Sequence, residues 1–355
     1  MDADLLLKAL IALAPVLILL LVFDRLDVFN LIPLRDIALL ALTGAALALI
    51  GFLANWTVIE GFPIGFGAYT RYGAPVIEET LKAAPVIALF ARNRLGFKID
   101  AAIAGFAVGA GFSVAENAWY LFTISGANVS DWLVRGFGTA VMHGAATALF
   151  AIVSHEMSEK QAASSAAHYR FTPLLFLPGL ALAMAIHSAF NHFPNYPLPI
   201  MAVTLLLAPL TLFLTLLKSD RATQQWLSAD AAAHRKALAD IRAGHFLQSD
   251  VGRAVLEAVA PIKGVSAEDV LAWAELKTAL ILRAEELILA SHAAAADAAG
   301  EDERLQFARL DALEQRLGKT IVAAINSRLG FSRNDVYELG RLRVRVQSSK
   351  ATDAA

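Results

Sequence analysis

The sequence contains no cysteine, and this absence excludes disulfide bonds, thiolate metal sites and cysteine nucleophiles. Charge is also scarce: Asp, Glu, Lys and Arg make up 17% of the 355 residues, whereas soluble globular proteins contain about 25%. The formal net charge is only −2, and the sequence shows no basic stripe, which argues against nucleic acid as a partner. Hydrophobic residues make up 57% of the chain. This composition favours a membrane protein over a water-soluble one.

The few charges are unevenly distributed along the chain. Residues 1–217 carry 24 charged side chains, and residues 218–355 carry 38. A bilayer span needs about 20 mostly apolar residues. Seven segments of the first part meet this need: Leu5–Phe23, Ile37–Ala54, Tyr69–Phe90, Ile99–Leu121, Trp132–Ser154, Pro173–Phe193 and Leu198–Leu217. The sequence therefore predicts an all-α polytopic membrane protein, with a transmembrane domain over residues 1–217 and a small helical cytoplasmic domain over residues 218–355.

Basic residues in the short loops predict the orientation, because cytoplasmic loops carry an excess of Lys and Arg. The loop after the third segment holds Arg92, Arg94 and Lys98, whereas the alternate loops hold only Arg71 and Arg135. We therefore expect a multi-pass protein of the cell (inner) membrane with an external N-terminus and a cytoplasmic C-terminus.

The C-terminal part shows helical periodicity without a chemical motif. Apolar residues recur at helical spacing over Val270–Ala290 and Leu305–Leu329. Gly264, Gly300 and Gly330 mark the expected turns. We find no internal repeat and no tract typical of metal binding in this part, so we expect a helical module whose candidate role is to bind another protein.

The third apolar segment contains charges that do not belong in lipid. Glu78, Glu79 and Lys82 lie in its middle, and each charged side chain at a bilayer centre costs about 2.5–3.5 kcal/mol. These side chains must therefore face protein or a polar cavity. Either carboxylate can meet the Lys82 ammonium on one helix face. A purely structural ion pair would explain the lysine and one glutamate but would leave the second glutamate unexplained.

Later segments add further polar side chains that are rare in spans. These are Glu116 in the fourth segment, His143 in the fifth, and His187 with Asn191 one turn later in the sixth. At about 1.5 Å of rise per residue, Glu79, Glu116, His143 and His187 all fall in the outer half of the membrane or at its midplane. A shared depth predicts a single polar site that opens outward.

Two chemistries suit such a site, and the residue types alone leave both open. A glutamate can act as general base toward water while His or Asn stabilises the oxyanion of a peptide carbonyl. Alternatively, Glu79, His143 and His187 are candidate ligands of a divalent metal such as zinc, with an open fourth position. A transporter or proton relay and a non-catalytic scaffold or receptor are the other functions that buried Glu, His and Lys allow.

The ordered motifs resemble those of the PrsW family of intramembrane proteases, which is related to the CAAX-prenyl endopeptidases and to the APH subunit of gamma-secretase. The resemblance rests on Glu78-Glu79-x-x-Lys82, Phe112-x-x-x-Glu116-Asn117, His143 and His187-x-x-x-Asn191, and it covers about residues 35–217.

The resemblance implies an endopeptidase that cuts a membrane-anchored protein, such as an anti-sigma factor, in or just outside the bilayer. It also implies that Glu78, Glu79, Glu116, His143 and His187 are catalytic or linked to a metal. Within that scheme we assign Glu79 as the base, Glu78 and Lys82 as its charge partners, and Glu116, His143, His187 and Asn191 as further site groups.

Overall fold

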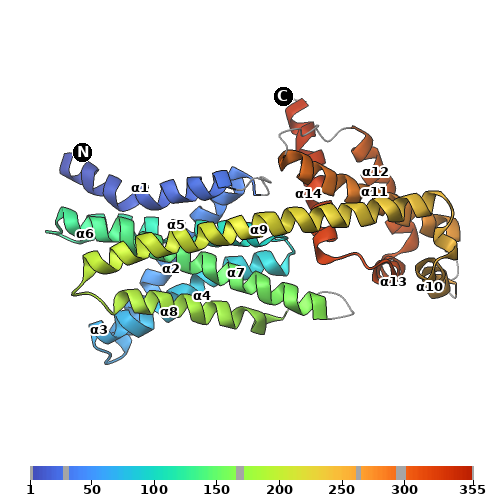
Figure 1. Ribbon diagram of the computed structural model, residues 1–355. Coiled ribbons are helices and arrows are strands. Elements are labelled where there is room, and N and C mark those ends of the chain that lie inside the picture. Colours follow the sequence, from blue (N-terminus) through green and yellow to red (C-terminus); the bar gives the residue numbers. More distant parts are fainter. Residues whose placement is uncertain (1–2, 27–31, 165–171, 261–264, 293–300, 354–355) are drawn as a thin grey trace. The chain divides into compact units, whose positions relative to one another are not determined.

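The computed structural model describes residues 3–26, 32–164, 172–260, 265–292 and 301–353, and every regular element among them is helical. The chain forms two compact units (Figure 1). Met1–Ala163 and Arg170–Asp220 form the first, which we call the membrane unit, and Arg221–Ala355 belongs to the second, the C-terminal unit. The boundary falls inside one long helix, three residues beyond the predicted boundary at residue 217.

The membrane unit is a bundle of long helices joined by short connections (Figure 1). Its elements are α1 (Ala3–Leu26), α2 (Leu34–Gly61), α3 (Phe66–Ala68), the π-helix η1 (Tyr69–Gly73), α4 (Ala74–Ala91), α5 (Lys98–Thr123), α6 (Val129–Leu133), the π-helix η2 (Val134–Thr139), α7 (Ala140–Ser164), the 3₁₀-helix η3 (Pro173–Phe176), α8 (Leu177–Asn191) and the first part of α9 (Pro197–Arg242).

Six described helices are long and apolar enough to cross a membrane: Ala3–Arg25, Leu34–Gly61, Lys98–Thr123, Val129–Gln161, Pro173–Asn191 and Pro197–Arg242. They coincide with six of the seven predicted spans. The remaining predicted span, Tyr69–Phe90, forms η1 and α4. This segment differs from the six in composition, because it contains three charged residues near its centre, Glu78, Glu79 and Lys82. Their side chains are buried inside the bundle.

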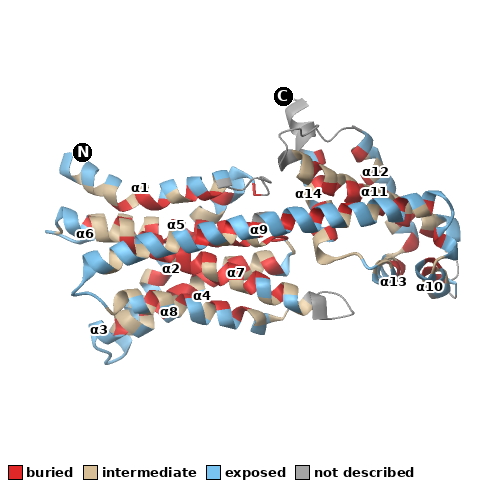
Figure 2. Ribbon diagram, in the orientation of Figure 1, coloured by how far each residue is buried: buried red, intermediate tan, exposed pale blue. Residues whose placement is uncertain are grey.

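Helices α5 and α7 form the centre of the membrane unit, since they are the most buried of the candidate spans. Figure 2 shows buried residues gathered in the interior of the bundle. Helices α1 and α2 pack against α5, and small residues permit the close approach of α5 to α7. A Cβ atom at Gly109 would lie 2.8 Å from the carbonyl carbon of His143 and 2.9 Å from Cα of Gly144. Glycine at this position therefore lets α7 bring His143 into the interior.

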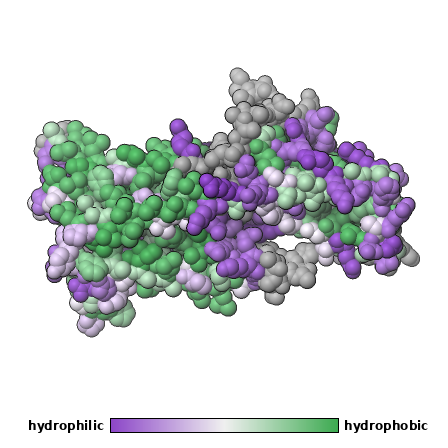
Figure 3. Space-filling view, in the orientation of Figure 1, coloured by the Kyte–Doolittle hydropathy of each residue, from purple (hydrophilic) through white to green (hydrophobic). Residues whose placement is uncertain are grey.

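The surface of the membrane unit is largely hydrophobic, whereas that of the C-terminal unit is rich in hydrophilic residues (Figure 3). Exposed leucines of α2, such as Leu42, Leu49 and Leu53, are 60–69% accessible. Apolar side chains exposed along a helix of this length are stable when lipid surrounds them. The chain is therefore a multi-pass membrane protein.

The C-terminal unit contains only helices in its described part, as expected. After the second half of α9 come the 3₁₀-helix η4 (Phe246–Gln248), α10 (Asp250–Val259), α11 (Ala267–His292), α12 (Glu301–Leu317), α13 (Lys319–Leu329) and α14 (Arg333–Asp353). Its core includes the fully buried Trp273 and Leu310.

Two glycines shape the end of this unit. Gly318, with φ of +79°, divides the predicted helical segment Leu305–Leu329 into α12 and α13, a break that the apolar periodicity did not reveal. Gly330, with φ of +73°, ends α13 at the predicted turn. Gly264 and Gly300 lie outside the described residues.

Candidate active site

Helix α4 places three charged side chains in the interior of the membrane unit. Glu78, Glu79 and Lys82 are exposed by 7%, 2% and 0%, respectively. A buried charge is stable only with partners, and Lys82 has two of them. Its Nζ lies 2.5 Å from Oε1 of Glu79 and 2.7 Å from Nδ1 of His143. The lysine therefore connects α4 with α7.

The two glutamates differ in how their oxygens are occupied. Oε1 of Glu79 is shared by Lys82 and by Nδ1 of His187, which lies 2.8 Å away. Oε1 of Glu78 accepts a hydrogen bond of 3.0 Å from Nδ2 of Asn55. Oε2 of Glu78 is buried and has no hydrogen-bond partner among the described residues. Glu78 thus carries the open carboxylate oxygen, and Glu79 is the member that pairs with Lys82.

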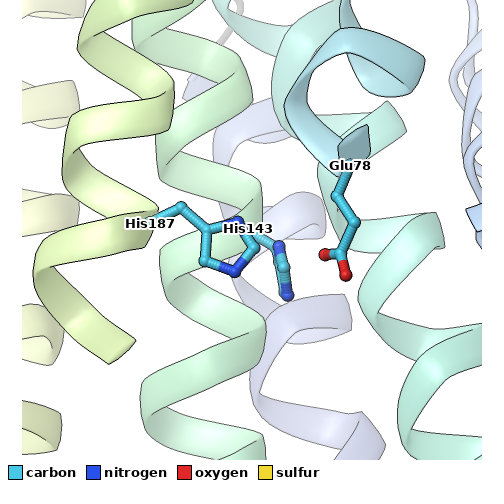
Figure 4. A group of neighbouring side chains, drawn as sticks. All are labelled: Glu78, His143 and His187. Atoms are coloured by element: carbon cyan, nitrogen blue, oxygen red, sulfur yellow. The ribbon is translucent and has the colours of Figure 1, made fainter. Parts of the chain in front are cut away.

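The two histidines face each other across the site. Their rings lie 4.8 Å apart, centroid to centroid, in an edge-on arrangement. Figure 4 shows both rings directed toward Glu78 from neighbouring helices. One ligand atom from each of Glu78, His143 and His187 lies within 4.8 Å of the others. These three side chains form the centre of the site.

Glu116 closes the site from α5. One of its oxygens, Oε2, lies 3.3 Å from Nε2 of His143, and the other lies 3.4 Å from a guanidinium nitrogen of Arg135. An ammonium at Nδ1 of His143 donates its hydrogen, so the neutral ring carries its proton on Nε2, toward Glu116. Lys82 and Glu116 therefore hold the two nitrogens of one imidazole.

Asn191, in contrast, makes no hydrogen bond to this centre within the described part of the chain. It lies one turn after His187, and its Nδ2 donates a hydrogen bond of 2.8 Å to the main-chain oxygen of Thr70 in η1. The contact fastens the end of α8 to the element that leads into α4. The structure thus brings six of the seven predicted site residues together and places Asn191 at the border.

Three residues of the site were not predicted from the sequence. Asn55 of α2 binds Glu78, and Tyr69 donates a hydrogen bond of 2.7 Å to Oδ1 of Asn55. Arg135, which we counted as a loop residue, lies instead in η2, where it also donates to Oδ1 of Asn117 at 3.0 Å and stacks on the ring of Tyr120. A single Asn in an apolar segment and an Arg beside a span are the signals that could have drawn attention to them.

A divalent metal fits the residue types at the centre of this site. One glutamate and two histidines with an open fourth position are a catalytic zinc set, and Oε2 of Glu78 is free of other partners. Glu79 on Nδ1 of His187 matches the carboxylate that commonly orients a ligating histidine. His143 would have to exchange one of its two contacts for the metal. The carboxylate in this group is Glu78, whereas the sequence had suggested Glu79.

Fold and site together define a polytopic membrane protein with a buried group of glutamate and histidine side chains. The family model of PrsW family intramembrane metalloproteases matches residues 33–217, more than half of the chain. The chain belongs to this family and is a membrane-embedded peptidase. Searches of curated proteins and of solved structures found no match.

Proposed function

We propose that Glu78, His143 and His187 hold the water that attacks a peptide bond of a membrane-anchored protein. The unpartnered Oε2 of Glu78 carries this proposal, because a buried carboxylate oxygen without a donor is free to accept a proton from water. Glu78 is then the general base in place of Glu79, whose Oε1 already receives two donors.

Glu79 and Lys82 act as positioning residues in this scheme. Glu79 fixes the ring of His187, and Lys82 fixes the ring of His143. Both rings are thereby held in fixed positions beside Glu78. Side chains that are already in place need no reorganisation when charge develops in the transition state.

The same three central residues would hold a zinc ion. When bound, the metal would lower the pKa of water and polarise the peptide carbonyl. Glu116 then supplies a second carboxylate beside the centre, since its Oε2 lies 3.3 Å from Nε2 of His143. Arg135 keeps that carboxylate oriented through its other oxygen.

The substrate that we propose is a membrane-anchored protein of the anti-sigma-factor kind, cut in the outer half of the bilayer or just outside it. Burial of the site within the membrane unit supports a substrate that reaches it through the bilayer. The predicted external N-terminus supports cleavage on the outer side.

The decisive experiment compares cleavage of a membrane-anchored peptide by the wild-type protein and by two variants in proteoliposomes. Glu78→Gln is expected to lower the cleavage rate by about 10²–10⁴-fold, the contribution of a general base. Glu79→Gln is expected to lower it by about 10–100-fold, as loss of an orienting carboxylate does. Glu60→Gln changes an exposed glutamate of α2 and serves as the matched control.

Two results would contradict the proposal. Wild-type cleavage by Glu78→Gln would exclude Glu78 as the base. Retained biological function in the double variant Glu78→Gln/Glu79→Gln would favour a scaffold instead. Metal analysis of the active wild-type preparation, with His187→Ala for comparison, distinguishes water held by a zinc ion from water held directly by the side chains.

A further inference from the structure

A second cluster of ionisable residues lies in the C-terminal unit, outside the region that the family model matches. It consists of Asp230 and His234 on α9, Glu285 on α11, and Asp335 with Glu338 on α14. These three helices are marked in Figure 1. The five residues, which we call the tail cluster, take no part in the proposed peptidase site.

The tail cluster is strongly acidic, and three of its five residues are buried. Glu285, Asp335 and Glu338 are exposed by 0%, 2% and 0%, respectively. Ionised carboxylates buried together repel each other and require a compensating positive charge.

Protein side chains provide little of that positive charge. Among the described residues, the ion pairs of these carboxylates are those with His234, which lies 2.8 Å from Glu285 and 3.8 Å from Asp335. Lys277 directs its ammonium instead to Oδ1 of Asn326, at 2.5 Å, and to the ring of Trp273. The cluster therefore has one imidazole for four carboxyl groups.

Many of the carboxylate oxygens also lack a hydrogen-bond partner. In the described part of the chain these are Oδ2 of Asp230, Oε2 of Glu285, Oδ1 of Asp335 and both oxygens of Glu338. Asp335 uses its other oxygen to accept from the main-chain nitrogen of Ser332 at the start of α14. Helix capping thus explains one oxygen of Asp335 and none of the others. Buried carboxylate oxygens without donors are what a bound cation would satisfy.

The spacing of the four central side chains suits a metal ion. One ligand atom from each of Asp230, His234, Glu285 and Asp335 lies within 4.8 Å of the others. Ligands on opposite sides of a divalent ion are about 4–5 Å apart, since each metal–ligand distance is about 2.0–2.5 Å. The gap of 3.8 Å between Nε2 of His234 and Oδ2 of Asp335 admits an ion in contact with both atoms.

The other ring nitrogen of His234 strengthens this assignment. Nδ1 lies 2.8 Å from Oε1 of Glu285, so this carboxylate can accept the Nδ1 proton and leave Nε2 free as a ligand. Carboxylates alone would suit calcium or magnesium, whereas one imidazole among carboxylates suits manganese, iron or zinc.

We propose that Asp230, His234, Glu285 and Asp335 form a binding site for one divalent transition-metal ion, of the manganese, iron or zinc class, in the C-terminal unit. Glu338, one turn after Asp335, contributes further negative charge to it. The ion joins α9, α11 and α14 and stabilises the folded unit.

The test uses the full-length protein in detergent with His187→Ala as background, so that the membrane site contributes no metal. After chelator treatment and dialysis against Mn²⁺, metal analysis is expected to find one bound ion per chain. Adding Glu285→Gln is expected to abolish binding. Adding Glu286→Gln, which changes the adjacent, partly exposed residue that pairs with Arg235, is expected to preserve it.

Thermal unfolding provides a second measurement of metal binding, so the test does not depend on the folding of a single variant. Saturating Mn²⁺ is expected to raise the unfolding midpoint of the His187→Ala protein by about 5 °C or more, and the partly exposed Asp230→Asn is expected to abolish this shift. Equal metal content and equal shifts with and without Glu285→Gln and Asp230→Asn would overturn the proposal. Absence of bound metal in the His187→Ala protein after dialysis against Mn²⁺ and, in parallel, against Fe²⁺ and Zn²⁺ would also overturn it.

Discussion

Asn55, on α2, donates a hydrogen bond of 3.0 Å to Oε1 of Glu78, on α4. Its own oxygen accepts from the hydroxyl of Tyr69 at 2.7 Å. This chain of two hydrogen bonds fixes the Glu78 carboxylate so that one oxygen is occupied and the other remains open. Asn55 is therefore a positioning residue of the proposed base.

Asn55→Leu is expected to lower kcat of peptide cleavage by about 10–100-fold with little change in KM, because loss of an orienting partner impairs the reacting group and not the binding of substrate. It should also displace the pH–rate profile, which a purely structural change would leave in place. Tyr69→Phe removes only the outer hydroxyl and should have a smaller effect. Equal kcat in wild type and Asn55→Leu would contradict this role.

Arg135 holds Glu116 and Asn117 with two different edges of its guanidinium group while it stacks on Tyr120. A lysine keeps the charge but lacks the planar, multiply donating group. Arg135→Lys is therefore expected to retain part of the cleavage rate, and Arg135→Met to lose at least ~10-fold. Identical rates for the two variants would show that the positive charge of Arg135 does not act on Glu116.

Gly109→Ala tests the close packing of α5 against α7. The added Cβ would meet the main chain of His143 and Gly144, so the free energy of unfolding in detergent should fall by about 1–3 kcal/mol, as for other overpacked sites. Gly67→Ala adds the same atom where nothing lies within 4 Å and should leave stability nearly unchanged. Equal losses in both variants would contradict the packing argument.

The absence of cysteine makes the predicted topology easy to test, because a single introduced cysteine is the only target of a thiol reagent. Ser125 follows α5 and Gln225 lies in α9 beyond the predicted span, and both are exposed. With an external N-terminus, Ser125→Cys should react with an impermeant maleimide in cells whose inner membrane is intact. Gln225→Cys should react only after the membrane is opened, and the reverse pattern would refute the orientation.

Lys277 predicts how the stability of the C-terminal unit depends on pH. Burial lowers the pKa of Lys277 to about 8, whereas an unfolded lysine has a pKa of about 10.4. Between these values the unfolded state binds the additional proton, so stability rises with pH. From pH 7.5 to 9.5 the gain in the free energy of unfolding should be on the order of 1–2 kcal/mol.

Denaturant unfolding of the wild type and of Lys277→Met at several pH values measures this gain. The variant has no ammonium at position 277, so its stability should rise less over the same pH range. Parallel pH profiles of the two proteins would contradict the lowered pKa of Lys277.

Several features of the protein could be predicted from the sequence because they depend on local composition. Long apolar segments must lie in lipid and form helices, since the bilayer offers no other partner for the peptide groups. Glu78, Glu79 and Lys82 in such a segment must be buried together, because lipid does not solvate charge. The ordered motifs were enough to indicate the PrsW family, which the family match confirms.

Which side chains of distant segments contact each other was decided only by the tertiary structure. Helical spacing permits Lys82 to pair with either Glu78 or Glu79. In the structure, Glu79 pairs with the lysine and with His187 of α8. Glu78 instead accepts a hydrogen bond from Asn55 of α2, and its second carboxylate oxygen remains without a donor among the described residues. In the same way, Asp230, Glu285 and Asp335 are each at least 50 residues from the others and form no sequence motif. They become a candidate metal site because packing of α9, α11 and α14 brings their carboxylates together. Periodicity along one helix carries no information about which faces of separate helices contact each other.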